Sequence, residues 1–461
     1  MARVPVLGRL YWGEYMALLG AISVLLLEGV IRLLTMCMPD ILIDWFYETS
    51  RCIFHHSHYA LLAPRTPETE ARADHVEAIR SAVNFERLCA IHGYVAEDHI
   101  VRTSDGYFLC LHRLCTKRGQ RRARPGVRTG KPVVYLHHGL LMNSEVWVCL
   151  TDEQRSIPFV LVEMGYDVWF GNNRGNKYSK KNMTLSPNTN SFGTSRYDLG
   201  MTDIPETLEY ILQLTKPTSG RLSYIGFSQG SAQAFAALSV HPQLNDKISV
   251  FIAIAPAFSP KGLASKLVDA LMKSSPNFLF LFFGRKCILP STVMWQSILY
   301  PPIFVQTIDT ALVFLFSWYS RNISQEQKLA AYAHLYSFAS VKSVVHWFQI
   351  MRTGVFQMYD DDAHSFYSKN FYHPVRVSCL SISRMIKPLI GDSVPQPQHH
   401  YTHRSPLRRF DSLVDIDAML GQLPDHTIPK PVDVDVIPKV VEALEQYQSP
   451  EDGRKRASRW H

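Results

Sequence analysis

The pentapeptide Gly226-Phe227-Ser228-Gln229-Gly230 constrains the fold of this chain more than any other feature. It joins the apolar run Leu222 to Ile225 (LSYI) to a stretch of small and apolar residues, SAQAFAALSV. The first run is typical of a buried strand and the second of a helix. A strand that turns at once into a helix needs small residues on both sides of the turn. We therefore predict a tight strand–turn–helix unit that raises the Ser228 hydroxyl clear of a sheet.

Further short apolar runs indicate the rest of this sheet. Tyr107 to Leu114, Val133 to Leu136, Asp167 to Phe170 and Ser249 to Ala255 are rich in β-branched or aromatic residues. Helical stretches such as Asp203 to Leu214 separate them. This alternation predicts a mostly parallel sheet with helices on both faces. The 461 residues suffice for one large α/β domain with a cap, or for two domains.

Charge and cysteine content exclude some functions. The net charge of +8 is concentrated in Lys117 to Lys131 and in a basic tail at Arg454 to Arg456. We interpret these as a solvated loop and a frayed terminus, with attraction to anionic lipid headgroups as the alternative. No aromatic platform accompanies the basic residues, so we expect no nucleic-acid partner. The eight cysteines form no CxxC pair, and we predict neither a metal site nor a disulfide scaffold.

The N-terminal segment favours a membrane anchor. Tyr15 to Leu27 is apolar or small, and hydrophobic residues continue to Met38 with interruptions at Glu28 and Arg32. About 20 such residues can cross a bilayer, but a charge near the centre is costly. We predict a single-pass helix, with an interfacial or hairpin anchor on a lipid droplet and a soluble amphipathic helix as alternatives. The membrane could be that of the endoplasmic reticulum, a lipid droplet or the cell surface.

Longer segments carry a family resemblance. Asn84 to Leu114, His137 to Val148 (HHGLLMNSEVWV), Gly165 to Asn182 (GYDVWFGNNRGNKYSKKN) and GFSQG are similar to segments of acid lipases and steryl ester hydrolases. The block from Phe251 to His364 looks most like the membrane-anchored fungal steryl ester hydrolases. The resemblance covers residues 84–376 and implies an α/β-hydrolase fold with a helical cap insertion.

The resemblance also implies a reaction and its residues. It predicts hydrolysis of a steryl ester or triacylglycerol through an acyl-serine intermediate, without a cofactor or an obligate protein partner. Carried over by position, it makes Ser228 the nucleophile and the backbone N–H groups of Leu140 and Gln229 the oxyanion donors. Asp411-Ser412-Leu413-Val414-Asp415 matches the acid motif, so Asp411 is the predicted catalytic acid. Asp415 and Asp417 are the alternatives.

The catalytic histidine is not evident. In this fold the chain order is Ser, then Asp, then His, yet only His426 and His461 follow Asp411. His426 resembles a non-catalytic position of the family, so it is a weak candidate. The segment Val377 to Phe410 also replaces an expected apolar strand ending in two glycines. We hypothesise a mis-spliced or wrongly predicted C-terminus, and the alternative function is a catalytically inactive, membrane-bound lipid-binding homologue.

These features predict five consecutive regions. They are an anchor (1–50), the first part of the core (80–256), an apolar helical cap (257–375), an atypical C-terminal part of the core (376–448) and a basic tail (449–461). Within the cap, Phe278 to Phe283 and Ile303 to Trp318 are the most apolar stretches. Their number favours a water-poor cavity for a bulky lipid over plain helix core.

Overall fold

The computed structural model describes most of the predicted core and part of the cap. The described residues are 39–58, 67–120, 125–184, 202–257, 299–354, 356–359 and 436–448, with scattered positions at 15–33 and 264–296. Several predicted features lie outside them: the site residues Asp411 and His426, the alternatives Asp415 and Asp417, and the segment Val377 to Phe410.

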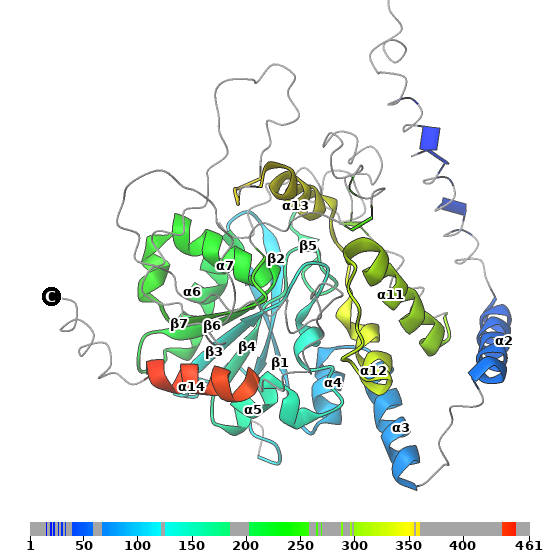
Figure 1. The fold of residues 1–461 in the computed structure, drawn as a ribbon. Helices are drawn as coiled ribbons and strands as arrows, with labels where there is room; N and C mark the ends of the chain where they lie inside the picture. Colours follow the sequence, from blue (N-terminus) through cyan, green and yellow to red (C-terminus); the bar gives the residue numbers. More distant parts are fainter. Residues whose placement is uncertain are drawn as a thin grey trace, which may run out of the picture.

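A seven-stranded, mostly parallel sheet forms the centre of the molecule (Figure 1). Its strands are β1 (Glu97–Arg102), β2 (Tyr107–Leu114), β3 (Val133–His137), β4 (Asp167–Phe170), β5 (Lys181–Asn182), β6 (Leu222–Phe227) and β7 (Ile248–Ile254). The order is β1-β2-β4-β3-β6-β7, and β5 pairs with β2. The pairs from β4 to β7 are parallel, whereas β2 is antiparallel to β1, β4 and β5.

Alternate residues of each parallel strand point to opposite faces of the sheet, so each face has its own hydrophobic core, which helices cover. On β3, Val134 packs on one face and Tyr135 on the other. The first face carries α4 (Phe85–Ile91), α5 (Ile157–Glu163) and α14 (Val436–Gln448). The second carries α6 (Ile204–Thr215) and α7 (Gln229–Val240). Figure 1 shows α5 and α14 on one side of the strands and α6 and α7 on the other.

The strand predictions agree with the structure to within two residues. The bounds of β2 and β4 are those predicted, β6 extends to Phe227, and β7 begins at Ile248. The expected fold class, a mostly parallel sheet with helices on both faces, is therefore confirmed. The antiparallel edge at β1 and β2 was not specified by the sequence patterns.

The described residues of the predicted cap region (257–375) include three helices and a small ribbon. The helices are α11 (Pro301–Phe316), α12 (Gln325–Leu335) and α13 (Val341–Thr353), and the ribbon pairs β8 (Cys287–Ile288) with β9 (Ala339–Ser340). The apolar stretch at 303–318 forms most of α11, while 278–283 lies outside the described residues. The short helices η2 (Ser144–Trp147) and η3 (Glu153–Arg155) and helix α3 (Pro67–Arg80) belong to the core side, and α3 packs against α12.

At the N-terminal end, the predicted anchor (1–50) falls mostly outside the described residues, and α2 (Asp40–His58) overlaps its last part. Among the helices that the structure describes, none is long and apolar enough to cross a bilayer. Ile41, Leu42 and Trp45 of α2 are exposed.

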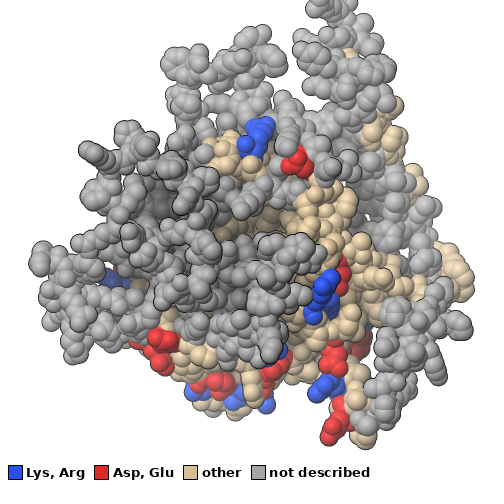
Figure 2. Space-filling model, viewed as in Figure 1, with Lys and Arg blue, Asp and Glu red and all other residues tan. Residues whose placement is uncertain are grey.

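In Figure 2, described basic and acidic side chains are intermixed along the lower side of the molecule.

Candidate active site

The backbone at Ser228 has the strained geometry of a tight strand-to-helix turn. Ser228 lies between β6 and α7 with φ 52° and ψ −114°. A positive φ is uncommon for a residue with a side chain and marks a backbone that its surroundings force into place. The Ser228 N–H donates to the Ile254 carbonyl at 2.8 Å, which fixes the turn against the end of β7. The hydroxyl is thus presented at the carboxyl edge of the sheet.

The two glycines of the pentapeptide are needed because backbone passes close to each. A methyl group on Gly230 would lie 2.4 Å from the His137 carbonyl oxygen, at the end of β3. A methyl group on Gly226 would lie 2.7 Å from the Ser231 nitrogen. Separations below 3.0 Å are not tolerated by real side chains, and the close neighbours here are backbone atoms. The prediction that small residues must flank the turn is confirmed.

The two predicted oxyanion donors lie near Ser228. Gln229 is the first residue of α7, where helix N–H groups have no partner within the helix. Leu140 belongs to the turn after β3, and a methyl group on its neighbour Gly139 would lie 3.2 Å from Ser228 Cβ. Neither N–H donates to another described residue. Both amides are therefore available to an oxyanion beside Ser228.

A cap helix covers this turn. Trp347 of α13 donates its indole N–H to Gln229 Oε1 at 2.8 Å. The same indole packs with Ala232 of α7 and Ile350 of α13, and Leu140 packs against this group. Sequence reasoning did not single out Trp347, although it lies in the HWFQIM segment that carries part of the resemblance. The contact positions the Gln229 side chain.

Beneath the turn lies a buried polar group that we call the oxyanion-turn network, namely Tyr135, His137, His138, Asn173 and Gln233. The Tyr135 hydroxyl lies 2.7 Å from His137 Nδ1, and Asn173 Oδ1 lies 2.9 Å from His137 Nε2. Asn173 Oδ1 also accepts from the Gln233 amide at 2.8 Å. His138 Nδ1 lies 2.8 Å from the Gly139 carbonyl, and its Nε2 accepts the Asn173 N–H at 3.1 Å.

This network is uncharged. Burial lowers the pKa of His137 to about 4 and that of His138 to about 3. Both rings are therefore neutral at pH 7, and each ring nitrogen already has a partner. Neither histidine is placed as the base for Ser228, in agreement with the chain order expected for this fold.

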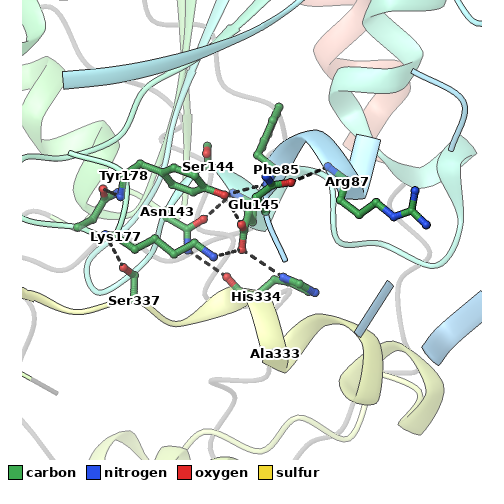
Figure 3. Close-up of polar contacts among 12 residues, drawn as sticks. Phe85, Arg87, Asn143, Ser144, Glu145, Lys177, Tyr178, Ala333, His334 and Ser337 are labelled. Atoms are coloured by element: carbon green, nitrogen blue, oxygen red, sulfur yellow. Dashed lines mark hydrogen bonds and ion pairs between the residues drawn. The ribbon is translucent and has the colours of Figure 1, made fainter. Parts of the chain in front are cut away.

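A second polar group connects the core to the cap, and Figure 3 shows it. We call it the core–cap cluster: Glu145, Lys177, Tyr178 and His334. Glu145 accepts hydrogen bonds from the Tyr178 hydroxyl and from Lys177 Nζ, the latter at 2.6 Å. Its carboxylate also lies 3.2 Å from Nδ1 of His334 on α12, whose Nε2 lies 2.7 Å from the Ile79 carbonyl.

The carboxylate of the core–cap cluster stays ionised. Burial would raise the pKa of Glu145, but the hydrogen bond from His334 and the positive charge of Lys177 outweigh it and lower the pKa below its ordinary value. Nearby, the Ser337 N–H donates to the Leu141 carbonyl at 2.7 Å. The cap segment after α12 is thus fastened directly beside Leu140.

The structure brings Ser228, Leu140 and Gln229 together, and their catalytic roles stay predictions. Of the residues that the structure describes, none hydrogen-bonds the Ser228 hydroxyl. The acid and base candidates Asp411 and His426 lie outside that part of the chain. Helix α14, which follows the undescribed segment, packs against β7. The polypeptide therefore returns to the core after the segment that holds Asp411 and His426.

Comparison with known proteins agrees with this geometry. Residues 85–151 match the family described as a partial alpha/beta-hydrolase lipase region, and residues 132–288 match the alpha/beta hydrolase fold. The chain is 46% identical to a probable lipase of Schizosaccharomyces pombe, over 77% of this chain and 76% of that protein. It is 31% identical to the gastric triacylglycerol lipase of Rattus norvegicus, over 66% of this chain and 73% of that protein. It is also 31% identical to the human lysosomal acid lipase/cholesteryl ester hydrolase, over 63% of this chain and 71% of that protein.

Proposed function

This chain belongs to the acid lipase family of carboxylic ester hydrolases, which have the α/β-hydrolase fold, and we propose that it hydrolyses lipid esters through an acyl–Ser228 intermediate. The observation that carries the proposal is the turn at Ser228. Its strained φ of 52° raises the hydroxyl beside two backbone amides that have no partner among the described residues.

The proposed mechanism follows from that arrangement. Ser228 attacks the ester carbonyl, and its proton must pass to a base. The oxygen of the tetrahedral intermediate receives hydrogen bonds from the N–H groups of Leu140 and Gln229, which strengthen as negative charge develops. Asp411 would orient the histidine that takes the proton, with His426 as a weak candidate for that base. No cofactor takes part in these steps.

For the substrate, we propose a bulky neutral lipid, either a steryl ester or a triacylglycerol. The apolar cap supports this choice. Helix α11 contributes a long apolar sequence, and Trp347 and Ile350 of α13 pack beside Leu140. Apolar walls next to the nucleophile favour acyl chains over small polar esters. The names of two relatives, a triacylglycerol lipase and a cholesteryl ester hydrolase, point to the same substrate class.

We further propose that the N-terminal region binds this protein to a membrane or lipid-droplet surface. The apolar sequence from Tyr15 to Leu27 supports the proposal, as do the exposed Ile41, Leu42 and Trp45 of α2. The test is flotation of the full chain with phosphatidylcholine vesicles, compared with a variant that lacks residues 1–58, which include α2. We expect only the full chain to float, and equal flotation of both would overturn the proposal.

A second candidate function is lipid binding without turnover. A sequence that has no evident catalytic histidine favours it. A serine without a base is a poor nucleophile at neutral pH. The two candidates therefore differ in one measurable property, the reactivity of Ser228.

The deciding experiment is labelling of the full chain with a fluorophosphonate serine probe, followed by hydrolysis assays on cholesteryl oleate and triolein. Ser228→Ala should abolish labelling and reduce turnover by about 10⁴-fold or more, whereas Ser219→Ala, on an exposed turn, should change neither. If the folded wild-type chain does not react, the lipid-binding candidate stands. In that case, peptides from the native protein that spell Val377 to Phe410 would contradict a mis-spliced C-terminus.

A further inference from the structure

Three side chains with metal-binding atoms meet on the β1–β2 hairpin, away from Ser228. In the antiparallel register Asp98 lies opposite His112, and Ile100 lies opposite Cys110. Cys110 and His112 are two residues apart on one strand, so their side chains point to the same face. Directly opposite residues of an antiparallel pair also share a face. The hairpin thus gathers a carboxylate, a thiol and an imidazole.

The two separations from His112 match those of neighbouring ligands around one ion. His112 Nε2 lies 3.5 Å from an Asp98 carboxylate oxygen and 3.6 Å from Cys110 Sγ. All three ligand atoms lie within 4.8 Å of one another. In a tetrahedral zinc site with bonds of about 2.0–2.3 Å, neighbouring ligand atoms are about 3.3–3.7 Å apart. The Asp98–His112 separation is also longer than an ordinary N–H···O hydrogen bond, about 2.7–3.2 Å.

The imidazole is held in the orientation that a ligand needs. His112 Nδ1 lies 2.8 Å from Ser144 Oγ, which also accepts from the Asn172 amide at 3.1 Å. The ring stacks on Phe85 at 4.2 Å between centroids and meets Tyr178 edge-on at 4.6 Å. These contacts direct Nε2 toward Asp98 and Cys110. A second partner of this kind on the other ring nitrogen is typical of metal-binding histidines.

The charges of the three groups suit a divalent cation. A neutral imidazole is the form of histidine that binds metal. Cys110 would bind as a thiolate, its thiol proton passing to solvent as the cation binds. A thiolate and a carboxylate then neutralise an ion of charge +2. Cys110 and His112 are buried, whereas the Asp98 side chain is 64% exposed and leaves the cation a route from solvent.

We propose that Asp98, Cys110 and His112 bind Zn²⁺, with a water molecule in the fourth position. Imidazole and thiolate ligands select zinc over magnesium or calcium, and three protein ligands leave one position open. The ion connects the exposed edge of the sheet to the Ser144 segment through His112. The expectation from cysteine spacing that the chain has no metal site would then be wrong, because the carboxylate comes from the neighbouring strand.

The test is metal binding by the full-length, folded chain. After chelation and dialysis, the protein is titrated with Zn²⁺ and with Co²⁺, whose thiolate charge-transfer absorption reports a Co–S bond. We expect one ion per chain and a Co–S band that arises from Cys110. Asp98→Asn should fold normally because the side chain is exposed, and should weaken Zn²⁺ binding by at least about tenfold.

The matched control is Cys115→Ser. Cys115 follows β2, is also buried, and lies 3.6 Å from a Glu97 carboxylate oxygen. The Co–S band should persist in this variant and disappear in Cys110→Ser. The proposal is overturned if folded wild type binds less than one Zn²⁺ per chain at micromolar metal, or if Asp98→Asn binds as tightly as wild type. A Co–S band lost with Cys115 instead of Cys110 would overturn it as well.

Discussion

The oxyanion-turn network and the core–cap cluster both bury histidines next to the loop that carries Leu140, but only the core–cap cluster buries a carboxylate. In the first, burial keeps His137 and His138 neutral, and every bond joins uncharged groups. In the second, the Glu145 carboxylate stays ionised because Lys177 and His334 contact it.

The difference follows from what each group connects. The oxyanion-turn network joins adjacent elements of the core, namely β3, α7 and the turn after β4, where sheet geometry already fixes the backbone. The core–cap cluster joins Glu145 to His334, 189 residues apart in the chain. Directional, charge-assisted hydrogen bonds can fix the position of a separate layer that apolar packing alone leaves less specified. We infer that charge positions the cap, while neutral bonds position the oxyanion donors.

The largest effect expected of a single substitution at pH 7 is that of Glu145→Gln. It leaves Lys177 and the buried His334 without their carboxylate partner, which costs about 3–5 kcal/mol of unfolding free energy for a buried pair. Chemical denaturation at pH 7 measures this cost. The control is Glu86→Gln on the surface of α4, which should change stability by less than about 0.5 kcal/mol. Equal effects of the two substitutions would show that the cluster does not fasten the cap.

As pH falls, the oxyanion-turn network should lose stability before the core–cap cluster does. The folded pKa values of His137 and His138, about 4 and about 3, lie below the ordinary 6.5. The unfolded chain therefore takes up protons as pH falls below about 6.5, while the folded chain does not. Stability should fall by about 1.4 kcal/mol per pH unit for each histidine. The pKa of Glu145 is lowered, so its contribution is present above about pH 4.5 and is lost only at lower pH.

A smaller effect at neutral pH is expected for His138→Leu. The substitution leaves the Asn173 N–H without an acceptor and the Gly139 carbonyl without a donor, at a cost of about 1–3 kcal/mol. It should also reduce the pH dependence between pH 6.5 and 4.5 by about 1.4 kcal/mol per unit, which thermal unfolding at several pH values measures. A variant with the wild-type pH dependence would contradict a neutral His138.

The smallest expected effect is that of Lys177→Met. The Lys177 side chain is 27% exposed, so water can replace it beside Glu145. We expect a loss of about 1 kcal/mol or less, measured by the same denaturation as for Glu145→Gln. A loss as large as that for Glu145→Gln would mean that Lys177, and not His334, is the main partner of the carboxylate.

Much of the core was predictable because its signals are local. Apolar runs of four to eight residues gave strand bounds within two residues of those observed, and the glycines around Ser228 gave the turn. The resemblance placed Leu140 and Gln229 as oxyanion donors, and they lie beside Ser228. Trp347 could not be found this way, because its contact with Gln229 spans 118 residues. The pairing of Asp98 with His112 could not be predicted either, because it depends on strand register.

The sequence by itself determined the strand–turn–helix unit, the layered α/β architecture and the identity of the candidate nucleophile, because each depends on residues that are close in the chain. Only the tertiary structure decided which histidines are buried and neutral, which carboxylate fastens the cap, and which side chains meet across the β1–β2 hairpin. Those properties depend on burial and on distances between remote residues, and both are set only when the layers pack together.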